Sequence, residues 1–105
     1  MINQLVQLDT DLWEAWIEFE QFNSACFGTL YVIGEIATGQ RLRKTSAKNR
    51  PQDLVLEIST ARAVGKRTKE VVYTEEITSI NQYKRIAIYL DGHLVKEFSE
   101  IEIMV

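Results

Sequence analysis

Leu54-Val55-Leu56-Glu57-Ile58-Ser59-Thr60, near the centre of the chain, is the clearest structural signal in this sequence. Side chains alternate between two faces along an extended backbone, so Leu54, Leu56 and Ile58 fall together on one face. We therefore expect a strand that turns this face towards a hydrophobic core.

The segments on either side of this stretch also favour strands. Residues 27–38 place apolar side chains in both phases, which is typical of a central strand covered on both faces. Residues 67–77 and 83–90 alternate apolar and polar side chains, which predicts strands with one face in water. Asp91-Gly92 follows directly, and because both residues tolerate positive φ, this dipeptide predicts a tight antiparallel hairpin into the last strand.

Residues 9–22 fit two periodicities. The two-residue alternation of a strand would place four apolar residues on one face: Trp13, Ala15, Ile17 and Phe19. The periodicity of a helix would instead align Leu5, Leu8, Leu12, Trp16 and Phe19 along one side. We favour the strand, preceded by a short helical turn before residue 12, because aromatic and β-branched residues are dense here.

The remaining segments complete the expected architecture. The apolar phase slips along the last strand, which predicts a bulge near Ser99. Residues 39–53 contain the only proline and many charges, and we expect a long loop there. The fold class is therefore all-β: one domain over residues 1–105, with about six antiparallel strands in a meander that closes as a small barrel or a two-sheet sandwich.

Charge is unevenly distributed along the chain. The net charge is −3, yet residues 41–69 hold nine lysine and arginine residues against two acidic ones. Basic side chains neutralise phosphates, so this segment is a candidate for binding single-stranded nucleic acid or anions. Its candidate residues are Arg41, Arg43, Lys44, Lys48 and Arg50. The alternative is a solvated loop whose charges keep the protein in solution.

The sequence contains little that resembles an active site. It has one cysteine, Cys26, and one histidine, His93, without a local signature of nucleophilic catalysis around either. Carboxylates recur at two-residue spacing in Glu18 with Glu20 and in Glu100 with Glu102, as on any wet strand face. We predict no catalytic residue, no metal ligand and no cofactor, and a hydrolase ranks third among the functional hypotheses.

The leading hypothesis is a non-enzymatic domain that binds a protein partner or a second copy of itself. Trp16 carries it, because the strand phase places this large aromatic residue on the face of Glu18 and Glu20 rather than in the core. Nucleic acid ranks second as a partner. A single cysteine and the absence of a long apolar run predict a cytoplasmic protein without membrane contact.

Overall fold

The computed structural model of this chain describes residues 12–22, 25–46, 50–60 and 64–104. The described residues are nearly all extended, which confirms the all-β prediction. They form eight strands: β1 (Glu14–Phe22), β2 (Ala25–Ala37), β3 (Gln40–Thr45), β4 (Asp53–Thr60), β5 (Thr68–Ile77), β6 (Arg85–Leu90), β7 (His93–Phe98) and β8 (Glu102–Met104).

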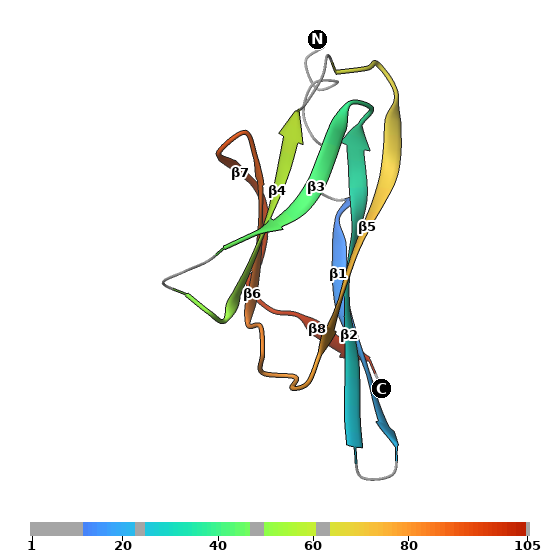
Figure 1. Cartoon of the computed structure of the whole chain (residues 1–105), viewed down its shortest axis with the longest axis vertical. Coiled ribbons are helices and arrows are strands. Elements are labelled where there is room, and N and C mark those ends of the chain that lie inside the picture. Colours follow the sequence, from blue (N-terminus) through green and yellow to red (C-terminus); the bar gives the residue numbers. More distant parts are fainter. Residues whose placement is uncertain (1–11, 23–24, 47–49, 61–63, 105) are drawn as a thin grey trace.

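The strands make two four-stranded sheets that pack as a sandwich (Figure 1). The first sheet has the order β5-β2-β1-β8 and the second the order β3-β4-β6-β7. The sandwich is one of the two predicted forms, and the barrel is not formed. The meander is also wrong, because the chain changes sheet several times, and these changes make β1 and β8, and likewise β4 and β6, parallel neighbours.

The core lies between the two sheets and confirms the alternation in residues 54–60. Leu54, Leu56 and Ile58 of β4 are fully buried. They pack in one cluster with the inward side chains of the other central strands, among them Leu30, Val32, Ile36, Ile86 and Ile88. β2 is central in its sheet, as predicted, between β5 and β1.

β1 confirms the strand and excludes the helix for residues 14–22. Trp13 and Ile17 are buried in the core, and Phe19 packs against it. Trp16 lies on the opposite face of the sheet, in phase with Glu14 and Glu18. Residues 9–11, and with them the predicted helical turn before residue 12, lie outside the described part of the chain.

Two glycines of β2 make room for two large rings, that of Trp13 directly before β1 and that of Phe19 within it. A Cβ atom at Gly34 would lie 2.2 Å from the Trp13 ring, and one at Gly28 would lie 2.6 Å from the ring of Phe19. Both glycines are buried and face the core. The indole of Trp13 can therefore lie flat against the backbone of β2.

The Asp91-Gly92 hairpin joins β6 and β7 as predicted. Both residues have positive φ, 47° at Asp91 and 86° at Gly92. The irregularity in this ladder falls at Ile88 and Tyr89 rather than near Ser99, where no bulge is found. Instead β7 ends at Phe98, and the chain crosses to the other sheet before β8, which explains the slip of the apolar phase.

The predicted long loop between residues 39 and 53 is in part a strand. β3 covers residues 40–45 and pairs antiparallel with β4. Its side chains alternate, so that Gln40 and Leu42 turn towards the core while Arg41 and Arg43 face water. Three of the candidate basic residues, Arg41, Arg43 and Lys44, are thus on an edge strand. Lys48 lies outside the described residues.

Candidate binding site on the outer face of β1 and β8

The parallel pairing of β1 with β8 builds a surface from two distant parts of the chain. Its register places Trp16 beside Glu102 and Glu18 beside Met104. All four side chains therefore point outwards from the same face of the sheet. The sequence had marked Trp16 with Glu18, and separately the pair Glu100 and Glu102, but nothing in it showed that the two sets meet.

Trp16 is held in place by two neighbours. Its ring stacks on Tyr31 of β2, with ring centroids 5.2 Å apart and planes inclined by 16°. Its indole Nε1 donates a hydrogen bond of 3.1 Å to the Glu18 carboxylate. Tyr31 and Glu102 flank Trp16 from opposite sides, because β2 and β8 are the two neighbours of β1.

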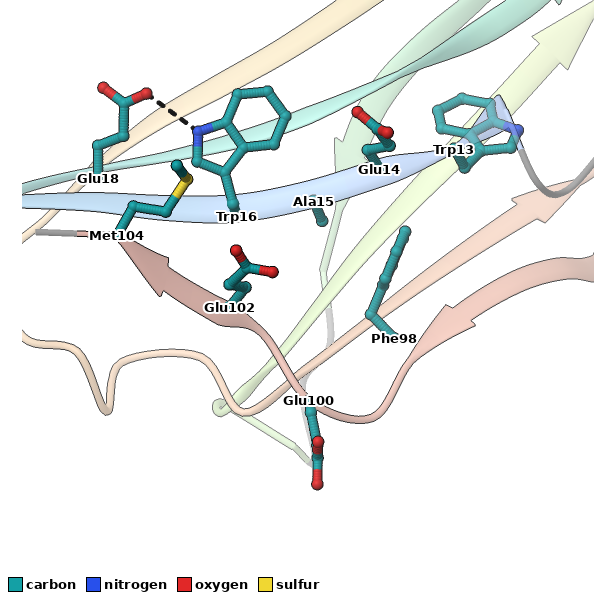
Figure 2. A pocket seen from close by; sticks show the side chains of 9 residues that line it. All are labelled: Trp13, Glu14, Ala15, Trp16, Glu18, Phe98, Glu100, Glu102 and Met104. Atoms are coloured by element: carbon teal, nitrogen blue, oxygen red, sulfur yellow. Dashed lines mark hydrogen bonds between the residues drawn. The ribbon is translucent and has the colours of Figure 1, made fainter.

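A pocket of about 600 Å³ opens beside this tryptophan (Figure 2). Trp13 and Phe98 form its apolar inner wall, and the strand residues of β1 and β8 form its rim. Its lining residues are Trp13, Glu14, Ala15, Trp16, Glu18, Phe98, Glu100, Glu102 and Met104. Figure 2 shows Glu102 projecting beside Trp16, whereas Glu100 points away from the other side chains.

A smaller pocket of about 230 Å³ continues the site along β1. Glu18 and Met104 line both pockets, and Phe19 and Glu20 complete the second one. β8 pairs with only three residues of β1, Trp16 to Glu18, so this second pocket lies where the described part of β8 ends. The three residues of the predicted partner surface therefore line two adjoining pockets, Trp16 the first, Glu20 the second and Glu18 both.

The outer face of this sheet is acidic. The phase set by the pairing places on it the glutamates Glu14, Glu18, Glu20, Glu35, Glu70, Glu76 and Glu102. Among the described strand residues, no lysine or arginine shares this face. Exposed apolar side chains lie between the carboxylates, with Phe27 60% and Val72 50% exposed.

The four predicted basic residues that the structure describes do not form one patch. Arg43 lies 3.8 Å from Glu57, and Arg50 lies 3.8 Å from Asp53. Lys44 points between the sheets, and Arg41 is exposed on the outer face of the second sheet. These ion pairs reduce the positive charge that the segment offers to phosphates. Nucleic-acid binding stays a prediction.

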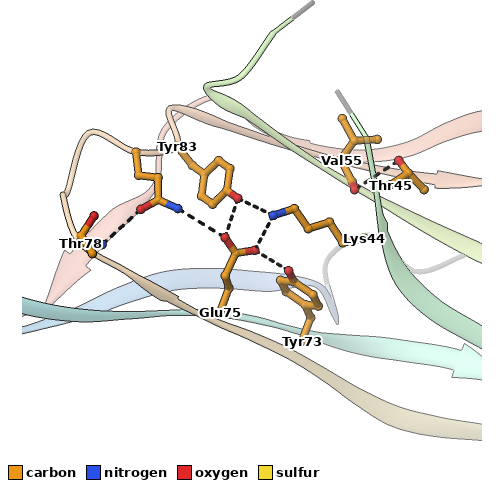
Figure 3. A network of polar contacts seen from close by, with 8 residues as sticks. Lys44, Thr45, Val55, Tyr73, Glu75, Thr78 and Tyr83 are labelled. Atoms are coloured by element: carbon orange, nitrogen blue, oxygen red, sulfur yellow. Dashed lines mark hydrogen bonds and ion pairs between the residues drawn. The ribbon is translucent and has the colours of Figure 1, made fainter. Parts of the chain in front are cut away.

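Lys44 belongs to a polar network that the sequence reasoning missed (Figure 3). Its Nζ lies 3.0 Å from the Glu75 carboxylate and donates a hydrogen bond of 2.8 Å to the Tyr83 hydroxyl. The hydroxyls of Tyr73 and Tyr83 each donate a hydrogen bond of 2.5 Å to Glu75. One signal was present: Glu75 shares its strand phase with the apolar residues Val71, Tyr73 and Ile77.

The network shifts the titration of its members in a consistent way. Burial disfavours a charged Glu75, but hydrogen bonds from Tyr73, Tyr83 and Lys44 outweigh it and lower the pKa of Glu75 below its ordinary value of 4.5. The hydrogen bond to Tyr83 and the contacts with Glu75 outweigh desolvation and raise the pKa of Lys44 above 10.5. Burial, and then the bond to Glu75, raise the pKa of the Tyr73 phenol. The ion pair therefore stays charged at neutral pH and ties β3 to β5.

The described residues bring together neither Cys26 with His93 nor a group of metal ligands. Cys26 lies in the β1–β2 hairpin and His93 in the β6–β7 hairpin, and these hairpins are at opposite ends of the molecule in Figure 1. Among the residues that the structure describes, no three of His, Cys, Asp and Glu are grouped so that they could hold a metal ion. The described part of the chain also contains no helix that is long and apolar enough to cross a membrane.

Comparisons with protein-family models, curated proteins and solved structures found no match to this chain. Functional inference therefore depends on the chemistry of the surface itself. The depression beside Trp16 offers an aromatic ring, an apolar wall and several carboxylate acceptors, which is a composition suited to binding.

Proposed function

We propose that this protein is a non-enzymatic β domain that acts by binding a protein partner through the outer face of β1 and β8. The observation that carries the proposal is the position of Trp16, which is only half-buried, whereas Trp13, directly before the same strand, is buried in the core. Tryptophan is enriched among the residues that contribute most to protein interfaces. A large ring kept out of the core therefore supports a role in recognition.

The surroundings of Trp16 add to this support. The Tyr31 stack and the Glu18 hydrogen bond hold the ring before any partner arrives, so little side-chain entropy is lost on binding. Met104, 48% exposed, adds a flexible apolar contact at the rim. An aromatic ring that is already held in position loses little entropy when a protein partner covers it, which favours binding. A reducing compartment such as the cytoplasm is part of the proposal, because the sequence has a single cysteine.

The test is a selection of displayed random peptides on the purified protein. Binders are then measured on Trp16→Ala and on the matched variant Phe27→Ala, which removes an exposed aromatic residue of the same face outside both pockets. We expect affinity to fall at least tenfold for Trp16→Ala and to be retained by Phe27→Ala. Binders that are indifferent to Trp16 would refute the proposal.

Light scattering at low and high salt decides whether the partner is a second copy of the chain. A salt-independent dimer that Trp16→Glu converts into a folded monomer makes self-association the function of this face. An unchanged mass of that variant excludes the face as a dimer contact.

The same samples are titrated with a single-stranded oligonucleotide. Binding that falls steeply with salt would favour nucleic acid instead. That result should also disappear when the basic residues are replaced by serine, namely Arg41, Arg43, Lys44, Lys48 and Arg50.

A further inference from the structure

We propose that the pocket beside Trp16 receives a lysine or arginine side chain from a basic segment of the partner. This inference rests on the proposed function, and it adds the chemical class of the group that is recognised. Three features of the pocket support it: the sign of its charge, the placement of its aromatic ring and the spacing of its carboxylates.

The sign of the charge selects a cationic partner. Glu14, Glu18, Glu100 and Glu102 line the pocket, and none of its described lining residues is basic. The acidic outer face of β2 and β5 extends the same potential across the sheet. An acidic or neutral segment would have to leave these carboxylates without a counter-charge, whereas a basic segment is attracted from a distance by the whole face.

The placement of Trp16 makes the pocket more specific than a diffuse negative surface. Tyr31 covers one side of the indole, so the side towards β8 is left for a ligand. Glu102 stands on that side, directly beside Trp16 in the strand register. A cation seated there contacts the π face of the ring and the carboxylate together, and tryptophan is the best of the aromatic residues for such a contact.

The spacing of the carboxylates argues for an organic cation over a metal ion. A metal needs several donors converging at short distances, and no such group occurs among the described residues. The pocket of about 600 Å³ has room for a long side chain and its neighbours. The Lys96 ammonium already lies 5.1 Å from the centre of the Phe98 ring. The apolar wall of Trp13 and Phe98 suits the methylene stem of an incoming lysine or arginine, whose charged end then reaches the carboxylates of the rim.

The experiment follows the indole N–H resonance of Trp16 by NMR during titration with short synthetic peptides. One peptide alternates lysine with serine, a second replaces lysine by arginine, and a third replaces it by the uncharged isostere norleucine. We expect the two basic peptides to shift the resonances of Trp16 and of the neighbouring β8 amides. The norleucine peptide should bind at least about fivefold more weakly. Raising the salt from about 20 to about 200 mM should weaken the basic peptides and leave the third unchanged.

Two charge-matched variants locate the recognition. Glu102→Gln should weaken the lysine peptide about threefold to tenfold. Glu76→Gln makes the same charge change on the same sheet face outside the pockets, and it should change the affinity by less than about twofold. Equal effects of the two variants would mean diffuse attraction and would overturn the inference.

The remaining outcomes separate this inference from the function on which it rests. Norleucine and lysine peptides that bind equally well at Trp16 overturn the cationic specificity and leave protein binding through Trp16 standing. Cationic specificity is likewise overturned, and protein binding is retained, if neither basic peptide shifts the Trp16 resonance while the affinity of the selected displayed peptides still depends on Trp16. Displayed binders that do not depend on Trp16 remove the proposed function itself.

Discussion

Trp16 and Tyr31, facing each other across β1 and β2, stack with their ring centroids 5.2 Å apart on the solvent side of the sheet. Cross-strand aromatic pairs contribute about 1 kcal/mol beyond the area that they bury. We expect Tyr31→Val to lower the free energy of unfolding by about 1 kcal/mol. Tyr31→Phe, which keeps the ring, should change it little. Urea denaturation of both variants measures the difference.

The same pair of variants tests the link between the stack and binding. Tyr31→Val frees the Trp16 side chain and should weaken peptides that bind beside it, because an ordered ring is replaced by one that must be immobilised. Tyr31→Phe should bind like the parent protein. Equal affinity in both variants would show that Trp16 does not depend on Tyr31 for its orientation.

Gly34 is predicted to be intolerant of even one added carbon. Gly34→Ala places a Cβ atom 2.2 Å from the Trp13 ring, which must then move in a packed core. We expect a loss of about 1 to 3 kcal/mol in the free energy of unfolding. In a Trp13→Leu background the ring is gone, so the added cost of Gly34→Ala should largely disappear. A cost that persists there would point to the backbone of β2 instead.

Lys44 and Glu75 should be energetically coupled across the two sheets. Their ion pair is 3.0 Å long, and the Glu75 side chain is only 18% exposed. Glu75→Gln weakens this pair and the hydrogen bonds from Tyr73 and Tyr83, with an expected loss of about 1 to 3 kcal/mol. A double-mutant cycle with Lys44→Met should give a coupling of about 1 kcal/mol. If the effects of the two single substitutions simply add up in the double variant, Lys44 and Glu75 are not coupled and the ion pair itself contributes nothing to stability.

The lowered pKa of Glu75 makes the free energy of unfolding depend on pH in the acidic range. Because the folded state lowers this pKa, the stabilisation is present above the ordinary value of 4.5 and is lost as the pH falls through the lower pKa of the folded protein. Urea midpoints measured below pH 4.5 should therefore fall less steeply in Glu75→Gln than in the parent. Identical slopes would assign the acid sensitivity to other carboxylates.

At alkaline pH the stability is expected to change in the opposite direction, falling as the pH rises. The pKa values of Lys44 and Tyr73 are raised in the folded state, so their contributions are present below the ordinary values of 10.5 and 10.0 and are lost as the pH rises through the folded pKa values. The double variant Lys44→Met with Tyr73→Phe should flatten the decline of the urea midpoint above pH 10. A decline as steep as that of the parent would assign it to other groups.

Local sequence patterns predicted the strands but not their partners. The alternation at Leu54, Leu56 and Ile58 and the turn at Asp91-Gly92 depend only on neighbouring residues, and both are found as predicted. The parallel pairs of β1 with β8 and of β4 with β6 depend on which sheet each strand joins, and no local pattern encodes that choice. β3 was missed because an edge strand tolerates the charges of Arg41, Arg43 and Lys44.

The residues of the candidate site also divide into those that local sequence patterns predicted and those that only the fold brings together. Trp16, Glu18 and Glu20 were marked because their phase opposes that of Ile17, which is local information. The contributions of Tyr31, Glu102 and Met104 follow from the registers of β2 and β8 with β1 and require the folded chain. The pairing of Lys44 with Glu75 likewise joins edge strands of two different sheets.

The parallel pairing of β1 with β8 also sets the stage of folding at which the pocket beside Trp16 is complete. The pocket combines residues 13–18 with residues 98–104, so a ribosome must have released nearly all of this stretch before the two halves can meet. Closing so long a loop is slow compared with forming a hairpin. Until β8 has paired with β1, the Glu102 and Met104 side of the pocket is missing, so the surface beside Trp16 exists only in the folded sheet.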